Sequence, residues 1–241
     1  MRFEQISEKS GYHRVDSTGP GATVGAPPAR VPGRRVRPGI GIADSIGSPA
    51  AGPVPSYIAE MADDARFRWI VDTMALRPGD RVLEIGPGSS ASIGCVAGAL
   101  ESGEYIGVDR SAAAVTRART RYAALVEVGR VRLVQAGVEQ LRLDRPVDGI
   151  SFGSGTFDKV LAVNVNLFWT KPPVTELALI RRLLGAGGTL ALFYGYGSPD
   201  TATAVGPKPS SDKLVGYLDA AGFDSRAVTA GDLLGVLARP R

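Results

Sequence analysis

The chain has 241 residues, of which 44% are hydrophobic, and this is enough for one folded domain with a substantial core. The single cysteine, Cys95, excludes an intrachain disulfide, and the single histidine, His13, excludes a histidine metal cluster. No apolar run reaches the roughly 18 residues of a membrane helix, and the N-terminus lacks the apolar segment of a secretory signal. We therefore expect a cytoplasmic protein with no membrane span and no metal site.

The net charge of +4 and the isoelectric point near 9.4 raise the question of nucleic-acid binding. Residues 1–56 hold 7 Lys and Arg against 4 Asp and Glu, whereas residues 57–241 hold 21 against 20. The positive excess therefore belongs to the N-terminal segment, and no nucleic-acid partner is expected. Residues 1–55 are also rich in Gly, Pro, Ala and Ser, which predicts a disordered or loosely ordered tail before a domain over residues 56–241.

Helical and extended patterns alternate through the rest of the chain. Apolar residues at helical spacing begin near residue 63, and helices are also expected after Ser89, from Ser111 to about 128, after Pro172 and from Ser211 to 222. The expected strands cover residues 81–85, 105–109, 131–135, 157–165, 189–194, 224–229 and 233–238, and a loop covers residues 136–156. This order predicts an α/β fold with a doubly wound, mostly parallel seven-stranded sheet. The short connection before residues 233–238 predicts an antiparallel last strand.

A glycine turn follows the first of these strands. The run Val82-Leu83-Glu84-Ile85-Gly86-Pro87-Gly88 ends an apolar strand in a carboxylate and a Gly-x-Gly turn, and Asp109 ends the next strand 23 residues after Gly86. Glycines let the backbone approach a ligand, and the second acid can accept both hydroxyls of a ribose. We therefore expect a nucleotide-type cofactor at the carboxyl edge of the sheet.

The glycine spacing departs from the dinucleotide fingerprint. The third glycine of Gly-x-Gly-x-x-Gly would fall at position 91, which is alanine. The carboxylate of Glu84, two residues before the turn, would repel a pyrophosphate and would suit a cationic ligand. The pattern therefore favours a cofactor that carries positive charge.

This stretch resembles motif I of the class I methyltransferases, which use S-adenosylmethionine. The resemblance covers residues 65–238 and implies a Rossmann-like methyltransferase fold. It implies that Glu84 meets the ammonium end of the cofactor, that Asp109 binds the ribose, and that both carboxylates face one pocket. The cofactor-binding residues that it implies are Glu84, Gly86, Pro87, Gly88, Asp109, Arg110, Gly137, Val138 and Asn164.

The resemblance is incomplete after the third strand. Many family members carry an acid there that binds the adenine amino group, but this chain has Ala136-Gly137-Val138. Glu139 lies one or two positions too late. The adenine would then meet the backbone of Gly137 and the apolar side chain of Val138.

Polar and aromatic side chains after the fourth and fifth strands are candidates for the acceptor site. Asn164 is expected to border the cofactor, since a buried amide without partners would be costly. The expected substrate-binding residues are Asn166, Trp169, Tyr194 and Tyr196. A capped turn for the asparagines and a packed surface aromatic for Trp169 remain alternatives.

The resemblance implies an enzyme that transfers a methyl group in line from S-adenosylmethionine to a small-molecule acceptor. The Asn/Asp-Pro-Pro-aromatic motif of amine-directed nucleic-acid methyltransferases is absent from residues 164–167. Two alternatives stay open. One is an NAD(P)-dependent oxidoreductase of Rossmann type, although no Tyr-x-x-x-Lys pair is found, and the other is a catalytically silent cofactor-binding partner protein. The sequence identifies neither a catalytic base nor an oligomeric state.

Overall fold

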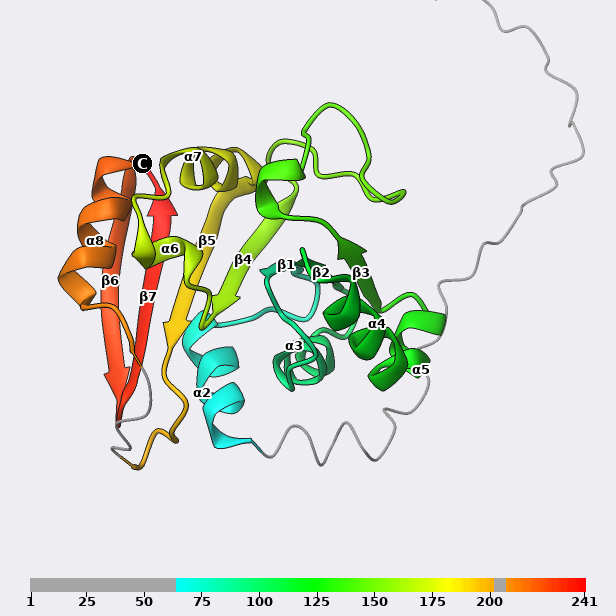
Figure 1. Ribbon diagram of the computed structural model, residues 1–241, viewed down its shortest axis with the longest axis horizontal. Helices are drawn as coiled ribbons and strands as arrows, with labels where there is room; N and C mark the ends of the chain where they lie inside the picture. Colours follow the sequence, from blue (N-terminus) through cyan, green and yellow to red (C-terminus); the bar gives the residue numbers. More distant parts are fainter. Residues whose placement is uncertain (1–63, 202–206) are drawn as a thin grey trace, which may run out of the picture. The chain divides into compact units, whose positions relative to one another are not determined.

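The computed structural model describes residues 64–201 and 207–241 (Figure 1). The expected tail over residues 1–55 and the first residues of the expected domain lie outside the described residues. All helices and strands named below belong to residues 64–241.

The described strands form one seven-stranded sheet with the order β3-β2-β1-β4-β5-β7-β6. Their bounds are β1 Arg81–Ile85, β2 Glu104–Asp109, β3 Val131–Gln135, β4 Phe157–Val163, β5 Leu184–Tyr194, β6 Phe223–Ala230 and β7 Leu233–Pro240. The first five strands pair in parallel, and β7 is antiparallel to both of its neighbours, β5 and β6. The predicted fold class, including the antiparallel last strand, is therefore confirmed.

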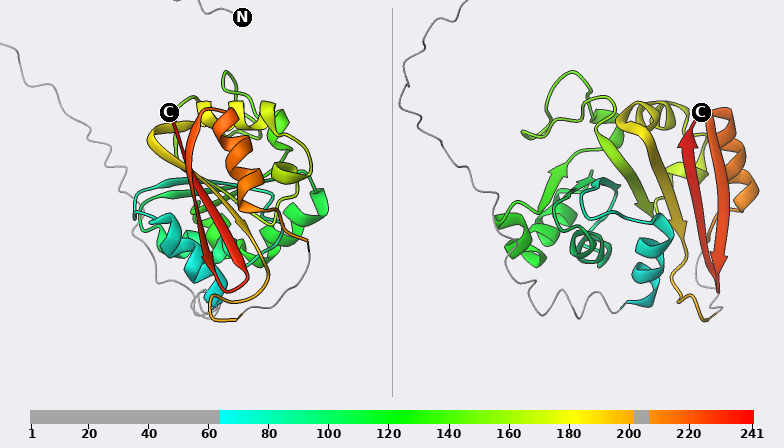
Figure 2. Two further views of the ribbon diagram at one scale, coloured as in Figure 1. Left: turned by 90° about the vertical axis from the view of Figure 1, so that its left-hand side faces the viewer. Right: turned by 180° about the vertical axis from the view of Figure 1, so that it is seen from behind.

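Helices cover both faces of the sheet, and the left view of Figure 2 shows α2 and α8 on opposite sides of the C-terminal strands. Helices α2 Ala65–Met74, α3 Ser92–Ala99, α4 Ala112–Arg121 and α5 Ala123–Glu127 contribute to one core cluster. The 3-10 helix η1 Val138–Gln140 and helices α6 Leu167–Thr170, α7 Val174–Leu183 and α8 Ser211–Ala220 contribute to the other. Adjacent strand residues Val82 and Leu83 are both fully buried and belong to different clusters, as expected for a strand covered on both faces.

Several boundaries differ from the sequence expectations. Strand β5 starts at Leu184 rather than at residue 189, because residues 185–188 form an irregularity inside it, where the register moves from Phe157↔Leu184 to Lys159↔Thr189. The helix expected from Ser111 to about 128 is broken at Tyr122, whose hydroxyl donates to the Ser90 carbonyl at 2.7 Å. The short helix α6 was not expected.

The helix caps also differ in part. Ser111, at which the sequence places the start of a helix, caps α4, with its hydroxyl accepting from the Ala114 N–H at 3.2 Å. Ser89 does not cap α3, which begins at Ser92, and Ser210 rather than Ser211 caps α8. Neighbouring serines compete for one cap position, so the composition alone locates the helix start only to within a few residues.

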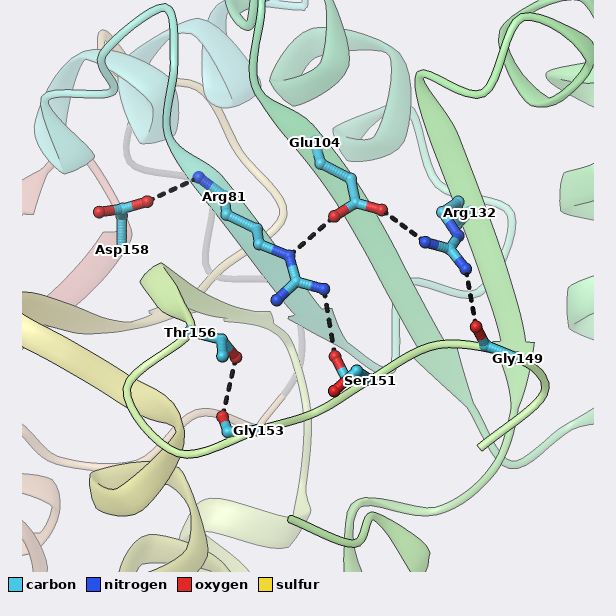
Figure 3. A network of polar contacts seen from close by, with 8 residues as sticks. All are labelled: Arg81, Glu104, Arg132, Gly149, Ser151, Gly153, Thr156 and Asp158. Atoms are coloured by element: carbon cyan, nitrogen blue, oxygen red, sulfur yellow. Dashed lines mark hydrogen bonds and ion pairs between the residues drawn. The ribbon is translucent and has the colours of Figure 1, made fainter. Parts of the chain in front are cut away.

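An ion-pair network ties the long loop after η1 to the amino ends of three strands (Figure 3). Glu104 on β2 accepts from Arg81 of β1 at 2.7 Å and from Arg132 of β3 at 2.9 Å. The two guanidinium groups then donate to the loop carbonyls of Ser151 at 3.1 Å and Gly149 at 3.2 Å. This network holds the loop at the edge of the sheet opposite to the carboxyl ends of the strands.

Candidate functional site

The turn after β1 depends on two glycines with left-handed backbone angles. Gly86 has a φ of +68° and Gly88 a φ of +61°, a region that side chains with a Cβ rarely adopt. The Gly86 N–H continues the pairing of β1 with β2 by donating to the Val108 carbonyl at 2.8 Å. A Cβ at Gly86 would also lie 3.1 Å from Cγ2 of Val165. The turn can therefore bring bare backbone to the edge of the sheet.

Asp109 at the end of β2 is joined to this turn. Its Oδ2 accepts from the Gly88 N–H at 2.9 Å, and its Oδ1 accepts from the Ser111 N–H at 2.8 Å. A carboxylate oxygen can accept more than one hydrogen bond, so each oxygen keeps capacity for a ligand hydroxyl. The two backbone donors also fix the orientation of the carboxylate.

A cavity of about 490 Å³ lies at the carboxyl ends of β1 to β4. Seven of the residues predicted from the sequence line it, namely Gly86, Asp109, Arg110, Gly137, Val138, Asn164 and Asn166. The other lining residues are Ile85, Val108, Ala136, Glu139, Val165, Leu167, Thr170 and Lys171. This is the place where ligands bind in open α/β sheets, at the strand ends on either side of the topological switch point between β1 and β4.

Glu139 lines the cavity although its sequence position had argued against it. A Cβ built on Gly137 would lie within 2.1 Å of Oε1 of Glu139, so this carboxylate occupies the space that a side chain at Gly137 would fill. The Gly137 N–H donates to Oε1 of Gln140 at 2.7 Å, which stabilises the tight η1 turn. A glycine two residues before the acid was the signal that this carboxylate can fold back toward β3.

Glu84 does not reach this cavity, and the expectation that it shares a pocket with Asp109 is corrected. Its side chain projects from the opposite face of β1, is 1% exposed, and accepts from the Ser92 hydroxyl at 2.7 Å and the Tyr105 hydroxyl at 2.8 Å. Burial raises the pKa of Glu84 to about 7, although the hydrogen bonds from Ser92 and Tyr105 act in the opposite direction. Alternation along the strand is the reason: Ile85, the next residue, lines the cavity instead.

Pro87 and Gly88 also lie outside the cavity lining. The Pro87 ring packs over Gly107 of β2, where a Cβ would lie 3.1 Å from Cγ of the proline. Gly88 acts through its N–H on Asp109. Both residues therefore shape the turn rather than the cavity wall.

Asn164 joins the ends of β4 and β5. It has a φ of +55°, which asparagine tolerates better than most residues. Its Nδ2 donates to the Gly195 carbonyl at 3.0 Å, and its Oδ1 accepts from the Gly195 N–H at 2.9 Å. Because both atoms of the amide are engaged, Asn164 borders the cavity as a fixed part of its wall.

Of the expected acceptor residues, only Asn166 lines the cavity. Tyr194 is 3% exposed and its hydroxyl donates to the Val165 carbonyl at 3.1 Å, and burial raises the pKa of Tyr194 well above its usual value. Tyr196 is 56% exposed, and Trp169 is half-buried against the core with its indole N–H buried and without a hydrogen-bond partner in the described residues. Thr170 and Lys171, which the sequence did not single out, line the cavity beside Asn166.

Two further observations concern only residues 64–201 and 207–241. These residues contain no group of three or more His, Cys, Asp or Glu side chains arranged to hold a metal ion. None of their helices has both the length and the apolar character that a transmembrane segment requires.

The fold and the site define an α/β protein with a cavity at the carboxyl ends of its parallel strands. Comparison with known families agrees with this class. Residues 82–188 match the family model described as a methyltransferase domain. Residues 82–188 are thus a methyltransferase domain, which is consistent with the class I methyltransferases, whose methyl donor is S-adenosylmethionine.

Solved structures support the same fold at low sequence identity. A SAM-dependent methyltransferase from Aquifex aeolicus is 18% identical, with a TM-score of 0.55 over 76% of this chain and 97% of that chain. The pyocyanin biosynthetic protein PhzM is 18% identical, with a TM-score of 0.56 over 73% of this chain and 55% of that one. The [4+2]-cyclase SpnF is 17% identical, with a TM-score of 0.54 over 72% and 80%. A search of curated proteins gave no significant match.

Proposed function

We propose that this enzyme methylates a small-molecule acceptor, with S-adenosylmethionine held in the cavity beside Asp109. The observation that carries the proposal is the connection between the glycine turn and the acid through the Gly88 N–H at 2.9 Å. This hydrogen bond places bare backbone and an oriented carboxylate at one edge of the cavity. A nucleoside without phosphates requires these two groups.

The lining residues fit the nucleoside part of the donor. Asp109 has one free acceptor position on each oxygen, which suits the two ribose hydroxyls. Val138 supplies an apolar wall, and Glu139 a carboxylate that can accept from the exocyclic amino group of adenine. Arg110 lies at the same side of the cavity.

Glu84 is proposed as a positioning residue for the turn. Its bond to Ser92 ties β1 to the first residue of α3, and its bond to Tyr105 ties β1 to β2. These two connections surround the Gly86–Gly88 segment. A buried carboxylate in this place stabilises the turn that faces the donor without touching the donor itself.

The acceptor is proposed to enter beside α6, where Asn166, Thr170 and Lys171 line the cavity after β4. Asn166, Thr170 and Lys171 are exposed and can reach a soluble ligand. A small acceptor is favoured because residues 57–241 are nearly balanced in charge, with 21 Lys and Arg against 20 Asp and Glu. Nucleic-acid binding depends instead on a clear excess of positive charge.

When bound, S-adenosylmethionine supplies a methyl group on positively charged sulfur, and in-line attack by the acceptor leaves neutral S-adenosylhomocysteine. The residues of the chain hold the reactants in line and exclude water, which is the main requirement for an activated donor. Asn164 maintains the wall at the strand tips through its two bonds to Gly195. Tyr194 is buried and its hydroxyl donates to the Val165 carbonyl at 3.1 Å, so we assign it a structural role rather than that of a general base.

Titration calorimetry tests the donor assignment. We expect S-adenosylmethionine and S-adenosylhomocysteine to bind one site on the full chain, and NAD to give no heat. Binding of NAD in place of S-adenosylmethionine would support the oxidoreductase alternative. A library of small acceptors with a labelled methyl donor then tests transfer, and donor binding without transfer to any acceptor would favour the silent binding protein.

A further inference from the structure

A second cavity, of about 360 Å³, lies at the amino end of β4, the opposite end from Asn164. Five residues separate Lys159 from Asn164 along the chain, which corresponds to roughly 16 Å in an extended strand. The C-terminal residues of α2 and the strands β4, β5, β6 and β7 form its walls. The cavity is therefore separate from the donor site.

Four side chains form a row across the sheet in this cavity. Lys159 pairs with Thr189, and Asp224 pairs with Arg239. Extending the register of β5 and β7 by one residue from Leu190↔Ala238 brings Thr189 opposite Arg239. Residues directly opposite on paired strands project from the same face, so all four side chains lie on the face covered by α2.

The charges of the lining are mostly positive. Lys159, Arg226 and Arg239 contribute three cations, and Asp224 is the one carboxylate among the described lining residues. Asp224 lies 3.8 Å from the guanidinium of Arg241, which offsets its charge. Within the described residues, the guanidinium groups of Arg226 and Arg239 make no hydrogen bond or ion pair.

Thr189 lies between two of these cations in the row. It is 5% exposed, and its Oγ1 is buried without a hydrogen-bond partner in the described residues. Leaving a buried hydroxyl unpaired costs free energy, and such groups in folded proteins usually have a partner. The Lys159 ammonium donates to the Met74 carbonyl at 3.0 Å and keeps two N–H groups for other acceptors.

We propose that this second cavity binds a phosphate-type dianion, either free or as the terminal group of a small molecule. Arginine binds phosphate oxygens through two parallel N–H groups, lysine adds a point charge, and a threonine hydroxyl adds one further donor. Burial lowers the pKa of Lys159; Asp80 opposes this shift and Arg239 adds to it. A bound dianion supplies the negative charge that would raise the pKa of this ammonium again.

Calorimetric titration of the full chain with inorganic phosphate, glycerol 3-phosphate and glycerol tests the proposal at constant ionic strength maintained with chloride. We expect saturable binding of inorganic phosphate or glycerol 3-phosphate and none of glycerol. Similar affinity for both anions identifies the phosphate group as sufficient, and much tighter binding of glycerol 3-phosphate identifies a phosphomonoester as the ligand. No saturable binding of either anion overturns the proposal.

Variants locate the site. Arg239→Gln and Arg226→Gln change exposed side chains and should each weaken phosphate binding at least tenfold, and Thr189→Val should weaken it about threefold or more. Arg117→Gln, on the exposed face of α4, is the matched control and should bind phosphate like the wild type. Affinity for S-adenosylmethionine should stay unchanged in Arg239→Gln, since the donor cavity lies at the other end of β4. Equal phosphate binding by Arg239→Gln and the wild type contradicts the assignment.

Discussion

The Gly88 N–H donates to Oδ2 of Asp109 at 2.9 Å and thereby connects the turn after β1 with the end of β2. The two features that the sequence separates by 21 residues thus behave as one structural unit. The carboxylate orients the turn, and the turn occupies one of the acceptor positions of the carboxylate. A change at Asp109 is therefore expected to affect the ligand and the backbone that faces it together.

Replacing Asp109 with alanine should weaken S-adenosylmethionine binding by about 2–4 kcal/mol, since one to two hydrogen bonds to a charged group are lost. Calorimetric titration measures the change. Asp144→Ala removes an exposed carboxylate in the loop after η1 and should leave the affinity unaltered. Unchanged affinity in Asp109→Ala would falsify the ribose assignment.

Replacing Glu139 with alanine should weaken S-adenosylmethionine binding by about 1–2 kcal/mol, because the adenine amino group loses its carboxylate acceptor. Glu139→Gln retains an acceptor oxygen and should recover part of the affinity. A donor analogue without the amino group separates the contributions. If that analogue loses as much affinity as S-adenosylmethionine in Glu139→Ala, Glu139 does not contact the amino group.

Replacing Gly86 with alanine should destabilise the fold by about 1–3 kcal/mol, because the φ of +68° is strained for alanine and the new Cβ meets Val165. Gly129→Ala is the matched control, since Gly129 has a φ of +74° and no atom lies within 4 Å of its added Cβ. Urea denaturation should give the larger loss for Gly86→Ala. Equal losses would show that the contact with Val165 costs nothing.

Glu84 should make stability depend on pH. Because burial raises its pKa from the ordinary 4.5 to about 7, the folded protein keeps a proton that the unfolded chain has already lost in this window. The free energy of unfolding should then fall as pH rises from 4.5 to 7, by at most about 1.4 kcal/mol per pH unit, and level off above pH 7. Urea denaturation of the wild type and Glu84→Gln between pH 5 and pH 8 measures this.

Glu84→Gln keeps the shape of the side chain and removes the titration, so the stability difference between variant and wild type should grow across this window in favour of the variant. Parallel curves would show that Glu84 keeps an ordinary pKa in the folded chain. The same variant should bind S-adenosylmethionine within about threefold of the wild type, since its side chain lies outside the cavity. A much larger loss of affinity would indicate that Glu84 contacts the donor directly.

Much of the fold could be predicted because it depends on local signals. The alternation of strands and helices, the glycine turn at Gly86 and the carboxylate at Asp109 are all encoded by neighbouring residues. The start of strand β5 was harder to predict. The glycines among residues 185–188 favour a turn, but pairing with β4 continues on both sides of the irregularity that they form. Val174 is in helical register with the buried Leu177 but is 69% exposed, because it lies at the first position of α7.

The site was predicted less completely, because the face on which a side chain projects depends on register. Glu84 and Asp109 both end strands in the sequence, but Glu84 lies two residues before the turn and projects to the opposite side of β1. Tyr194 likewise ends β5 but points into the core and donates to Val165. Glu139 was discounted on spacing, but its carboxylate lies in the space that a side chain at Gly137 would fill.

The cavity wall is drawn from five stretches, residues 85–86, 108–110, 136–139, 164–167 and 170–171. Because the wall combines all five stretches, we expect that a chain in which β4 has not yet paired with β1 lacks a complete binding site. S-adenosylmethionine, the proposed ligand, should therefore bind only to fully folded molecules and shift the folding equilibrium toward them by mass action. Cells depleted of this metabolite should then lose the enzyme faster to proteolysis, because a larger fraction of the chains is open at any moment.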